Sequence, residues 1–162
     1  MRIGVISDTH NHLPNVARIV ELLNQAGVER VVHTGDITQA RTLEVLARLD
    51  PPLIGVFGNN DRGERDALEA AAARYDITLS DPPFTLQLAE RRIVIVHVPR
   101  ALADLSPADH DVALHGHTHR RTIERDGGRL VFNPGECAGQ VAGLNAIGVV
   151  DLTTLATEIL RF

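Results

Sequence analysis

The chain has 162 residues, of which 44% are hydrophobic and 23% are charged. This composition excludes a disordered chain, a collagen and a coiled coil, and the length predicts a single globular domain over residues 1–162. The formal net charge of -5 and the aromatic content of 3% exclude a general nucleic-acid or anionic-membrane surface, because such surfaces need basic patches or stacking rings.

The cysteine content and the hydropathy pattern indicate a compartment. The single cysteine, Cys137, cannot form an internal disulfide, and it lacks a histidine at a spacing typical of an activated thiol. No signal peptide and no run of about 18 apolar residues is present. We therefore expect a cytoplasmic protein with Cys137 as a small buried residue. The oligomeric state stays open, with a homodimer as one expectation.

Strand and helix patterns alternate through the first half of the chain. Short β-branched runs at residues 3–7, 28–33 and 53–57 predict buried strands, and a fourth run lies at 93–97. Amphipathic helical patterns follow the first three strands, around residues 16–23, 43–46 and 68–75. This order predicts parallel strands with right-handed crossovers, and in such sheets ligands bind beyond the carboxyl ends of the strands.

The second half predicts mainly antiparallel strands. Asp126-Gly127-Gly128 joins runs at 122–125 and 130–132 in the way a tight hairpin does. Runs at 146–152 and 155–160 predict a second antiparallel pair. Between these halves, residues 98–109 contain two prolines and predict the longest loop, directly after a strand that ends on a histidine.

Side chains able to bind metals follow five separate apolar runs. The segments are Asp8-Thr9-His10, Gly35-Asp36, Gly58-Asn59-Asn60-Asp61, His97 and Gly116-His117-Thr118-His119. Taken alone, each has an ordinary interpretation as a turn, a solvated loop or a histidine at the edge of the core. Their joint occurrence in a short chain favours a metal site built from carboxylate, amide and imidazole ligands. The ligand order differs from that of metallo-β-lactamases, and the chain is too short for an amidohydrolase barrel.

This ordered set resembles the calcineurin-like metallophosphoesterases, over essentially the whole chain. Together with Asn133-Pro134-Gly135, it is similar to the small bacterial and archaeal phosphodiesterase branch and to the retromer subunit of the same fold. The resemblance implies an α/β fold with a four-layer α/β/β/α sandwich. It also implies that a small phosphoester, most often a diester, is hydrolysed by a hydroxide that bridges two divalent metal ions. Manganese is the first expectation, with iron, zinc and nickel as alternatives.

The resemblance also assigns residues to this site. One ion would take Asp8, His10, Asp36 and His119, and the other would take Asp36, Asn59, His97 and His117, with Asp36 as the bridge. Asp36, Asn59 and Asn60 are the expected catalytic residues. Many members of the family have a histidine near the leaving group where Asn60 stands, and small members often have a cysteine there. A second departure is Val98, because the ligand histidine before it is usually followed by glycine.

Some polar residues near the motifs have open roles. Asp61 and Glu136 are candidates to orient the ligand histidines through their free ring nitrogens. Arg100 is a candidate contact for the substrate phosphate, although an exposed arginine is usually a solvated charge. His33 is predicted to support the site or the core rather than to bind metal, and three other histidines are predicted to be structural or solvated, namely His12, His110 and His115.

Two other functions compete with catalysis. A non-catalytic protein-binding scaffold of the same fold, with a vestigial metal site, is the main alternative. The presence of every ligand of the family favours catalysis over this scaffold. A nuclease ranks last because it would need capping segments and a basic surface.

Overall fold

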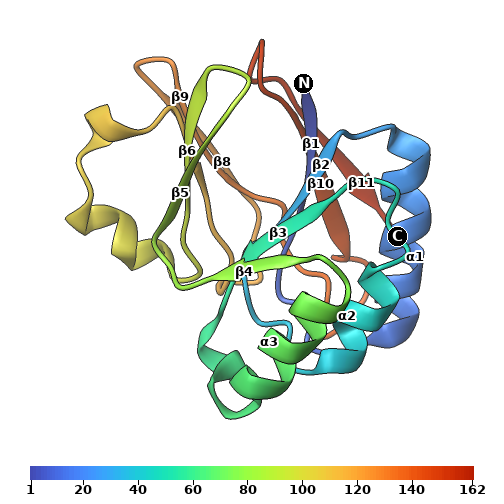
Figure 1. Ribbon diagram of the computed structural model, residues 1–162. Coiled ribbons are helices and arrows are strands. Elements are labelled where there is room, and N and C mark those ends of the chain that lie inside the picture. Colours follow the sequence, from blue (N-terminus) through green and yellow to red (C-terminus); the bar gives the residue numbers. More distant parts are fainter.

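Two β-sheets pack face to face in the computed structural model, which describes residues 1–162 (Figure 1). Sheet A has six strands in the order β11-β10-β1-β2-β3-β4, and sheet B has five in the order β5-β6-β7-β9-β8. The strands of sheet A are β1 (Arg2–Ile6), β2 (Arg30–His33), β3 (Leu53–Val56), β4 (Thr78–Ser80), β10 (Ala146–Asp151) and β11 (Thr157–Arg161). The strands of sheet B are β5 (Phe84–Leu88), β6 (Arg91–Ile95), β7 (Val112–Leu114), β8 (Thr122–Asp126) and β9 (Arg129–Asn133).

Three α-helices cover the outer face of sheet A (Figure 1). They are α1 (Leu13–Ala26), α2 (Ala40–Leu46) and α3 (Arg65–Arg74), and each comes after one of the parallel strands β1, β2 and β3. The longest, α1, buries one stripe of apolar side chains at helical spacing, namely Val16, Ile19, Val20 and Leu23. It begins where the His12 ring accepts the Asn15 N–H, and it ends at Gly27, which has a left-handed φ of 63°.

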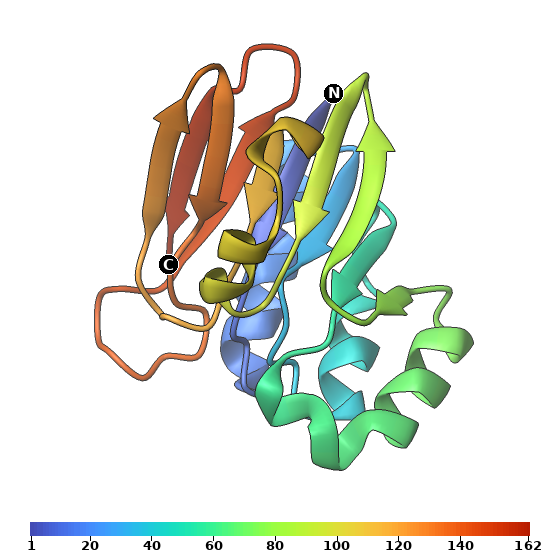
Figure 2. The same ribbon diagram turned by 90° about the vertical axis from the view of Figure 1, so that its left-hand side faces the viewer.

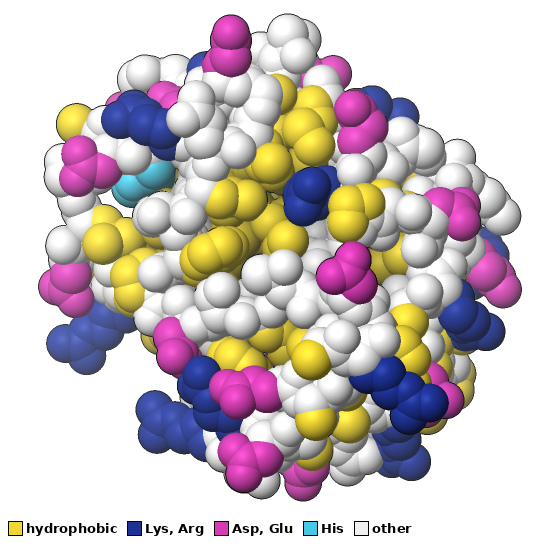
Figure 3. All heavy atoms as spheres, in the orientation of Figure 1, with side chains coloured by type: hydrophobic (Ala, Val, Ile, Leu, Met, Phe, Trp, Pro, Cys, Tyr) yellow, Lys and Arg dark blue, Asp and Glu magenta, His cyan; other side chains and the backbone are white.

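The core between the sheets follows from strand alternation. In β1, Ile3 and Val5 face sheet B, whereas Gly4 and Ile6 lie on the side of the helices. A side chain at Gly4 would collide with Leu23 of α1, so close packing of helix on sheet requires glycine there. In Figure 3 hydrophobic side chains gather where this inter-sheet core reaches the surface beside the edge strand β5.

A thin layer covers the outer face of sheet B (Figure 2). The predicted loop at 98–109 forms two 3₁₀ helices, η2 (Pro99–Asp104) and η3 (Pro107–Asp109). Ala101, Leu102 and Leu105 pack on Val94 and Val96 of the strand region before them. The predicted four-layer α/β/β/α sandwich is therefore confirmed, with a fourth layer made of 3₁₀ turns. None of the helices has the length and apolar character needed to cross a membrane.

The prediction of mainly antiparallel strands in the second half is confirmed, but it did not include two parallel pairs in sheet B. The hairpin β8–β9 and the pair β10–β11 are antiparallel as expected, but β6, β7 and β9 are parallel neighbours. The three-residue strands β4 and β7 are too short to show a period, and β5 is half exposed, so none of them was predicted. The parallel pairing is important because it brings the carboxyl ends of β6 and β7 to the site.

Candidate metal centre

All seven predicted metal ligands lie beyond the carboxyl ends of five strands. Asp8 and His10 follow β1, Asp36 follows β2 and Asn59 follows β3. Sheet B contributes His97 after β6, and His117 and His119 after β7. Contacts of 4.0 Å or less join these side chains into one continuous group, in the order His119, Asp8, His10, Asp36, His97, Asn59 and His117.

One end of this group consists of a buried carboxylate and two histidines. Nε2 of His10 lies 4.0 Å from Asp8 Oδ1, and Nε2 of His119 lies 3.7 Å from the same oxygen. The two rings stack with centroids 5.2 Å apart. His10 Nε2 is buried and has no hydrogen-bond partner, although it lies 3.5 Å from Asp36 Oδ2. A buried imidazole nitrogen without a partner, facing two carboxylates, fits a cation between them.

The other end is centred on Asn59. Its Oδ1 lies 2.9 Å from His97 Nε2 and 2.9 Å from His117 Nδ1, and His97 Nε2 is 3.3 Å from Asp36 Oδ2. His97 Nδ1 donates to the Thr34 carbonyl at 2.9 Å, which orients the ring so that Nε2 faces Asn59 and Asp36. The Asn59 oxygen thus contacts both histidines, and His97 in turn contacts Asp36. These four side chains form the second half of the group.

The electrostatics also favour cations. Burial alone would raise the Asp36 pKa, but hydrogen bonds from His97 and Asn60 outweigh it and hold the pKa well below its usual range. Asp36 is therefore an anion at neutral pH. Burial raises the pKa of Asp8, partly offset by the hydrogen bond from Ser7. Two buried carboxylates with so few fixed cations nearby call for an external positive charge. The donor set of carboxylates, amide and imidazoles suits divalent transition metals.

Comparison with known proteins agrees with this geometry. Residues 1–155 match the model of the calcineurin-like phosphoesterase superfamily domain. The chain belongs to this superfamily. It is 34% identical over 155 residues to phosphodiesterase MJ0936 of Methanocaldococcus jannaschii, which covers 93% of both chains.

Two solved structures share the fold of this chain. A structure described as a novel archaeal phosphodiesterase superposes with a TM-score of 0.91 at 31% identity, over 100% of both chains. Vps29 from Entamoeba histolytica gives a TM-score of 0.68 at 20% identity, over 100% of this chain and 99% of that one. At 20% identity the likeness to Vps29 concerns the fold alone.

Close backbone packing explains the glycines of this superfamily member. A Cβ at Gly58 would lie inside contact distance of the Asp36 backbone nitrogen and Oδ1, and one at Gly116 would collide with Ser7 Oγ. Gly35, with φ of 105°, would place a Cβ 2.7 Å from His97 Nδ1. These three glycines let loops from both sheets meet at the centre.

Five of the seven candidate ligands have left-handed backbone conformations, which L side chains rarely adopt. They are Asp8 (φ 51°), His10 (39°), Asp36 (59°), His117 (68°) and His119 (55°). Such conformations are costly and cluster at functional sites, where the surrounding structure holds them. No feature of the sequence indicated them.

The predicted role of Asp61 and Glu136 is wrong. The fully buried Asp61 carboxylate contacts no histidine ring, because it accepts the backbone N–H groups of Asp36, Thr38 and Gly58 at 3.0, 2.7 and 2.6 Å. It ties the loop after β2 to the loop after β3. Glu136 accepts the N–H groups of Gln140 and Val141 and so holds the 136–145 loop. The ring nitrogen of His97 is oriented by a backbone carbonyl instead.

The remaining polar residues fall into two groups. Asn60 lies at the centre, where its backbone and side-chain N–H groups donate to the two oxygens of Asp36 at 2.9 and 2.7 Å. His33 is buried, accepts the Gly35 N–H and contacts Thr9 Oγ1 at 3.1 Å, so it supports the site from below as predicted. Arg100 is exposed, and none of the ion pairs or hydrogen bonds of the structure connects it to the centre.

Proposed function

We propose that this chain is a metal-dependent phosphodiesterase that hydrolyses a small phosphoester with two divalent ions, with manganese as the first candidate. The observation that carries the proposal is the group of seven donors from five strand ends, with the buried, unpartnered His10 Nε2 inside it. The similarity to proteins named as phosphodiesterases supports a diester as substrate. Iron, zinc and nickel are alternatives that the same donors accept.

The contacts also support a division of the ligands between two ions. Asp8, His10 and His119 lie close enough together to share one ion. Asn59, His97 and His117 meet at the Asn59 oxygen and would hold the second. Asp36 contacts both groups through Oδ2, at 3.5 Å from His10 and 3.3 Å from His97. In this proposal Asp36 is the bridging ligand.

The residues around the site would have different roles in catalysis. Bound divalent ions would supply positive charge for the phosphoryl oxygens and generate a nucleophile from water at neutral pH. Asp36, which its hydrogen bonds keep anionic, is buried between the two groups of ligands and would hold the positive charge there. The buried Asp61 fixes the Asp36 backbone, and the Thr34 carbonyl fixes the His97 ring. Asn59 and His117 are exposed, so a substrate reaches the centre from their side.

Asn60 sets a limit on this chemistry. Its amide can donate hydrogen bonds near the reacting group but cannot transfer a proton as an imidazolium does. Esters with a stable leaving group are therefore the substrates that this site handles best.

The scaffold alternative is less favoured. All family ligands are present and their donor atoms converge, whereas a scaffold needs no such convergence. The proposal also includes a cytoplasmic location, and the single cysteine, Cys137, is free and buried.

The test measures metal content and turnover together. Protein reconstituted with Mn²⁺ should hold about two ions per chain and hydrolyse bis(4-nitrophenyl) phosphate, and a chelator should remove both properties reversibly. Asp36→Asn should lower the metal content and abolish turnover. Asp104→Asn, which changes an exposed carboxylate of η2, is the matched control and should keep both properties.

Two outcomes would contradict the proposal. Full metal content and near-normal turnover in Asp36→Asn would remove Asp36 from the centre. Two bound ions without turnover of any diester or monoester would favour the scaffold.

A further inference from the structure

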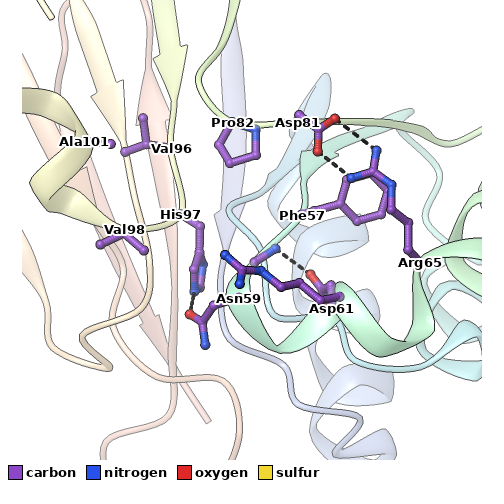
Figure 4. Close-up of a pocket in the computed structure, with 12 residues that line it drawn as sticks. Phe57, Asn59, Asp61, Arg65, Asp81, Pro82, Val96, His97, Val98 and Ala101 are labelled. Carbon is purple, nitrogen blue, oxygen red and sulfur yellow. Dashed lines mark hydrogen bonds and ion pairs between the residues drawn. The ribbon is translucent and has the colours of Figure 1, made fainter. Parts of the chain in front are cut away.

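A pocket opens directly beside the metal centre, between the two sheets. It has a volume of about 350 Å³, which lies in the range of small-molecule sites. Two candidate metal ligands, Asn59 and His97, form one end of it. Figure 4 shows the His97 ring between the two sides of this pocket, with Asn59 below it. A group attached to a phosphate at the centre would therefore reach the pocket without crossing bulk solvent.

Two apolar walls face each other across this pocket. Val96, Val98 and Ala101, from the end of β6 and from η2, lie on one side in Figure 4. Phe57, at the end of β3, lies on the other side, and Pro82 lies between the walls. Val98 is 36% exposed, so part of its side chain is open to a ligand in the pocket. An apolar group of the substrate would contact both walls at once, and a ring can do so with little loss of conformational freedom.

The charged residues that line the pocket differ in whether they have a partner within the protein. Arg65 stacks on the Phe57 ring at 4.3 Å and bonds both oxygens of Asp81, at 2.5 and 3.0 Å, so its charge is compensated. Asp61 directs its oxygens to backbone N–H groups. Arg62 is exposed at the pocket and takes part in none of the ion pairs of the structure. It is the cation left to meet a negative group of a ligand.

We propose that this pocket holds an ester group of the substrate, and that this group is an aromatic or similarly flat ring carrying an acidic substituent that Arg62 binds. The inference rests on the proposed function, because the phosphate must sit at the metal centre for its ester group to enter the pocket. The substrate class is thus an aryl or heteroaryl phosphoester with a second anionic group, rather than a simple alkyl phosphate.

Binding of stable phosphonates to the Mn²⁺-loaded protein tests the pocket by titration calorimetry. Phenylphosphonate should bind about tenfold more tightly than methylphosphonate, because the ring leaves water. Ala101→Phe fills the pocket and should remove this advantage while leaving methylphosphonate affinity unchanged. Ala103→Phe is the matched control, since Ala103 lies on the same 3₁₀ helix, is exposed and does not line this pocket.

A second arm tests Arg62 with an exposed substitution that leaves the core intact. 4-Phosphonobenzoate should bind about fivefold more tightly than phenylphosphonate, and Arg62→Gln should abolish the difference. Arg74→Gln is the control, because it removes the same charge from an exposed position of α3 outside the pocket. This variant should keep the fivefold difference in affinity between the two probes.

The possible results distinguish a failure of the pocket proposal from a failure of the proposed function. Equal affinity of methyl- and phenylphosphonate for the wild type, or an equal loss of both in Ala101→Phe, would overturn the pocket proposal alone. A wild type that does not prefer the carboxylated probe would overturn the role of Arg62. Failure of every phosphonate to bind while two metal ions are present would overturn the proposed function itself.

Discussion

A single methyl group at Gly58 should dismantle the metal centre. The Asp36 carboxylate passes directly over the Gly58 Cα, so a Cβ there would lie 2.8 Å from Asp36 Cγ and still closer to Oδ1 and the backbone nitrogen. The two loops cannot separate easily, because Asp61 Oδ2 accepts both the Asp36 N–H and the Gly58 N–H, at 3.0 and 2.6 Å. Backbone strain is not involved, because the Gly58 φ of -99° is open to any residue. The requirement for glycine is therefore steric.

The size of the effect follows from this overlap. Relieving it needs a shift of about 1 Å, whereas a functional site tolerates about 0.5 Å. Overpacking of this kind costs about 1–3 kcal/mol, partly offset by about 0.4–1 kcal/mol from the less flexible unfolded chain. The melting temperature of the metal-free protein should fall by a few degrees, since about 1 kcal/mol corresponds to roughly 2–4 °C at this size. Metal affinity should drop by at least about tenfold to a hundredfold.

The measurement compares Gly58→Ala with Gly63→Ala in the same segment. A Cβ at Gly63 meets no atom within 4 Å, so this variant should match the wild type in metal content and turnover and be equally or slightly more stable. Thermal unfolding with and without Mn²⁺ separates the fold from the site, because Mn²⁺ should raise the melting temperature of the control and barely that of Gly58→Ala. Wild-type metal content with turnover within twofold in Gly58→Ala would refute the steric reasoning.

Three further predictions concern other groups. Asn60→His adds a candidate acid, so the hydrolysis of alkyl esters should become up to about 100-fold faster, whereas that of aryl esters should barely change. The plot of log kcat/KM against leaving-group pKa should therefore be flatter for the variant. An unchanged slope would contradict this prediction. Burial lowers the His33 pKa from 6.5 to about 3, so the unfolded chain binds the extra proton and up to roughly 5 kcal/mol of stability is lost as the pH falls from 6.5 to 3. Denaturant titrations of metal-free protein should show a steeper loss for the wild type than for His33→Gln, and parallel curves would contradict this. Burial raises the pKa of Cys137 to about 12, so a thiol reagent at pH 8 should label only the unfolded protein, and rapid native labelling would oppose it.

Periodicity explains why the first half of the fold could be predicted. The apolar spacing in α1 shows a helical period, and the continuous β-branched runs of β1, β2 and β3 are long enough to be recognised as buried strands. The alternation of strand and helix then implies parallel pairing. The strands β4 and β7 have three residues each, fewer than any period needs. The parallel placement of β7 beside β6 depends on contacts between segments that the local pattern does not encode.

The candidate site shows the same division between local and non-local information. Metal-capable side chains after apolar runs were visible in the sequence because strand ends are local features. The role of Asp61 was not, because its hydrogen bonds to the Asp36 and Thr38 N–H groups span more than twenty residues. The pocket was also missed, since its walls combine residues such as Phe57, Pro82 and Ala101 that individually carry no chemical signature.

Metal binding and the packing of the two sheets must be coupled in this fold. Of the proposed ligands, sheet A supplies Asp8, His10, Asp36 and Asn59 after its strands, and sheet B supplies His97, His117 and His119. Neither sheet alone holds the complete proposed set. Hydrogen bonds already join the two sheets at this site, among them those from His97 Nδ1 to the Thr34 carbonyl and from the His117 N–H to the Asp8 carboxylate at 3.0 Å. Ions bound between the sheets add further cross-links that the unfolded chain lacks, so they stabilise the sandwich by mass action. The apolar core between the sheets in turn sets the distance between the ligands. Core residues far from the ions should therefore affect metal affinity through the packing of the two sheets.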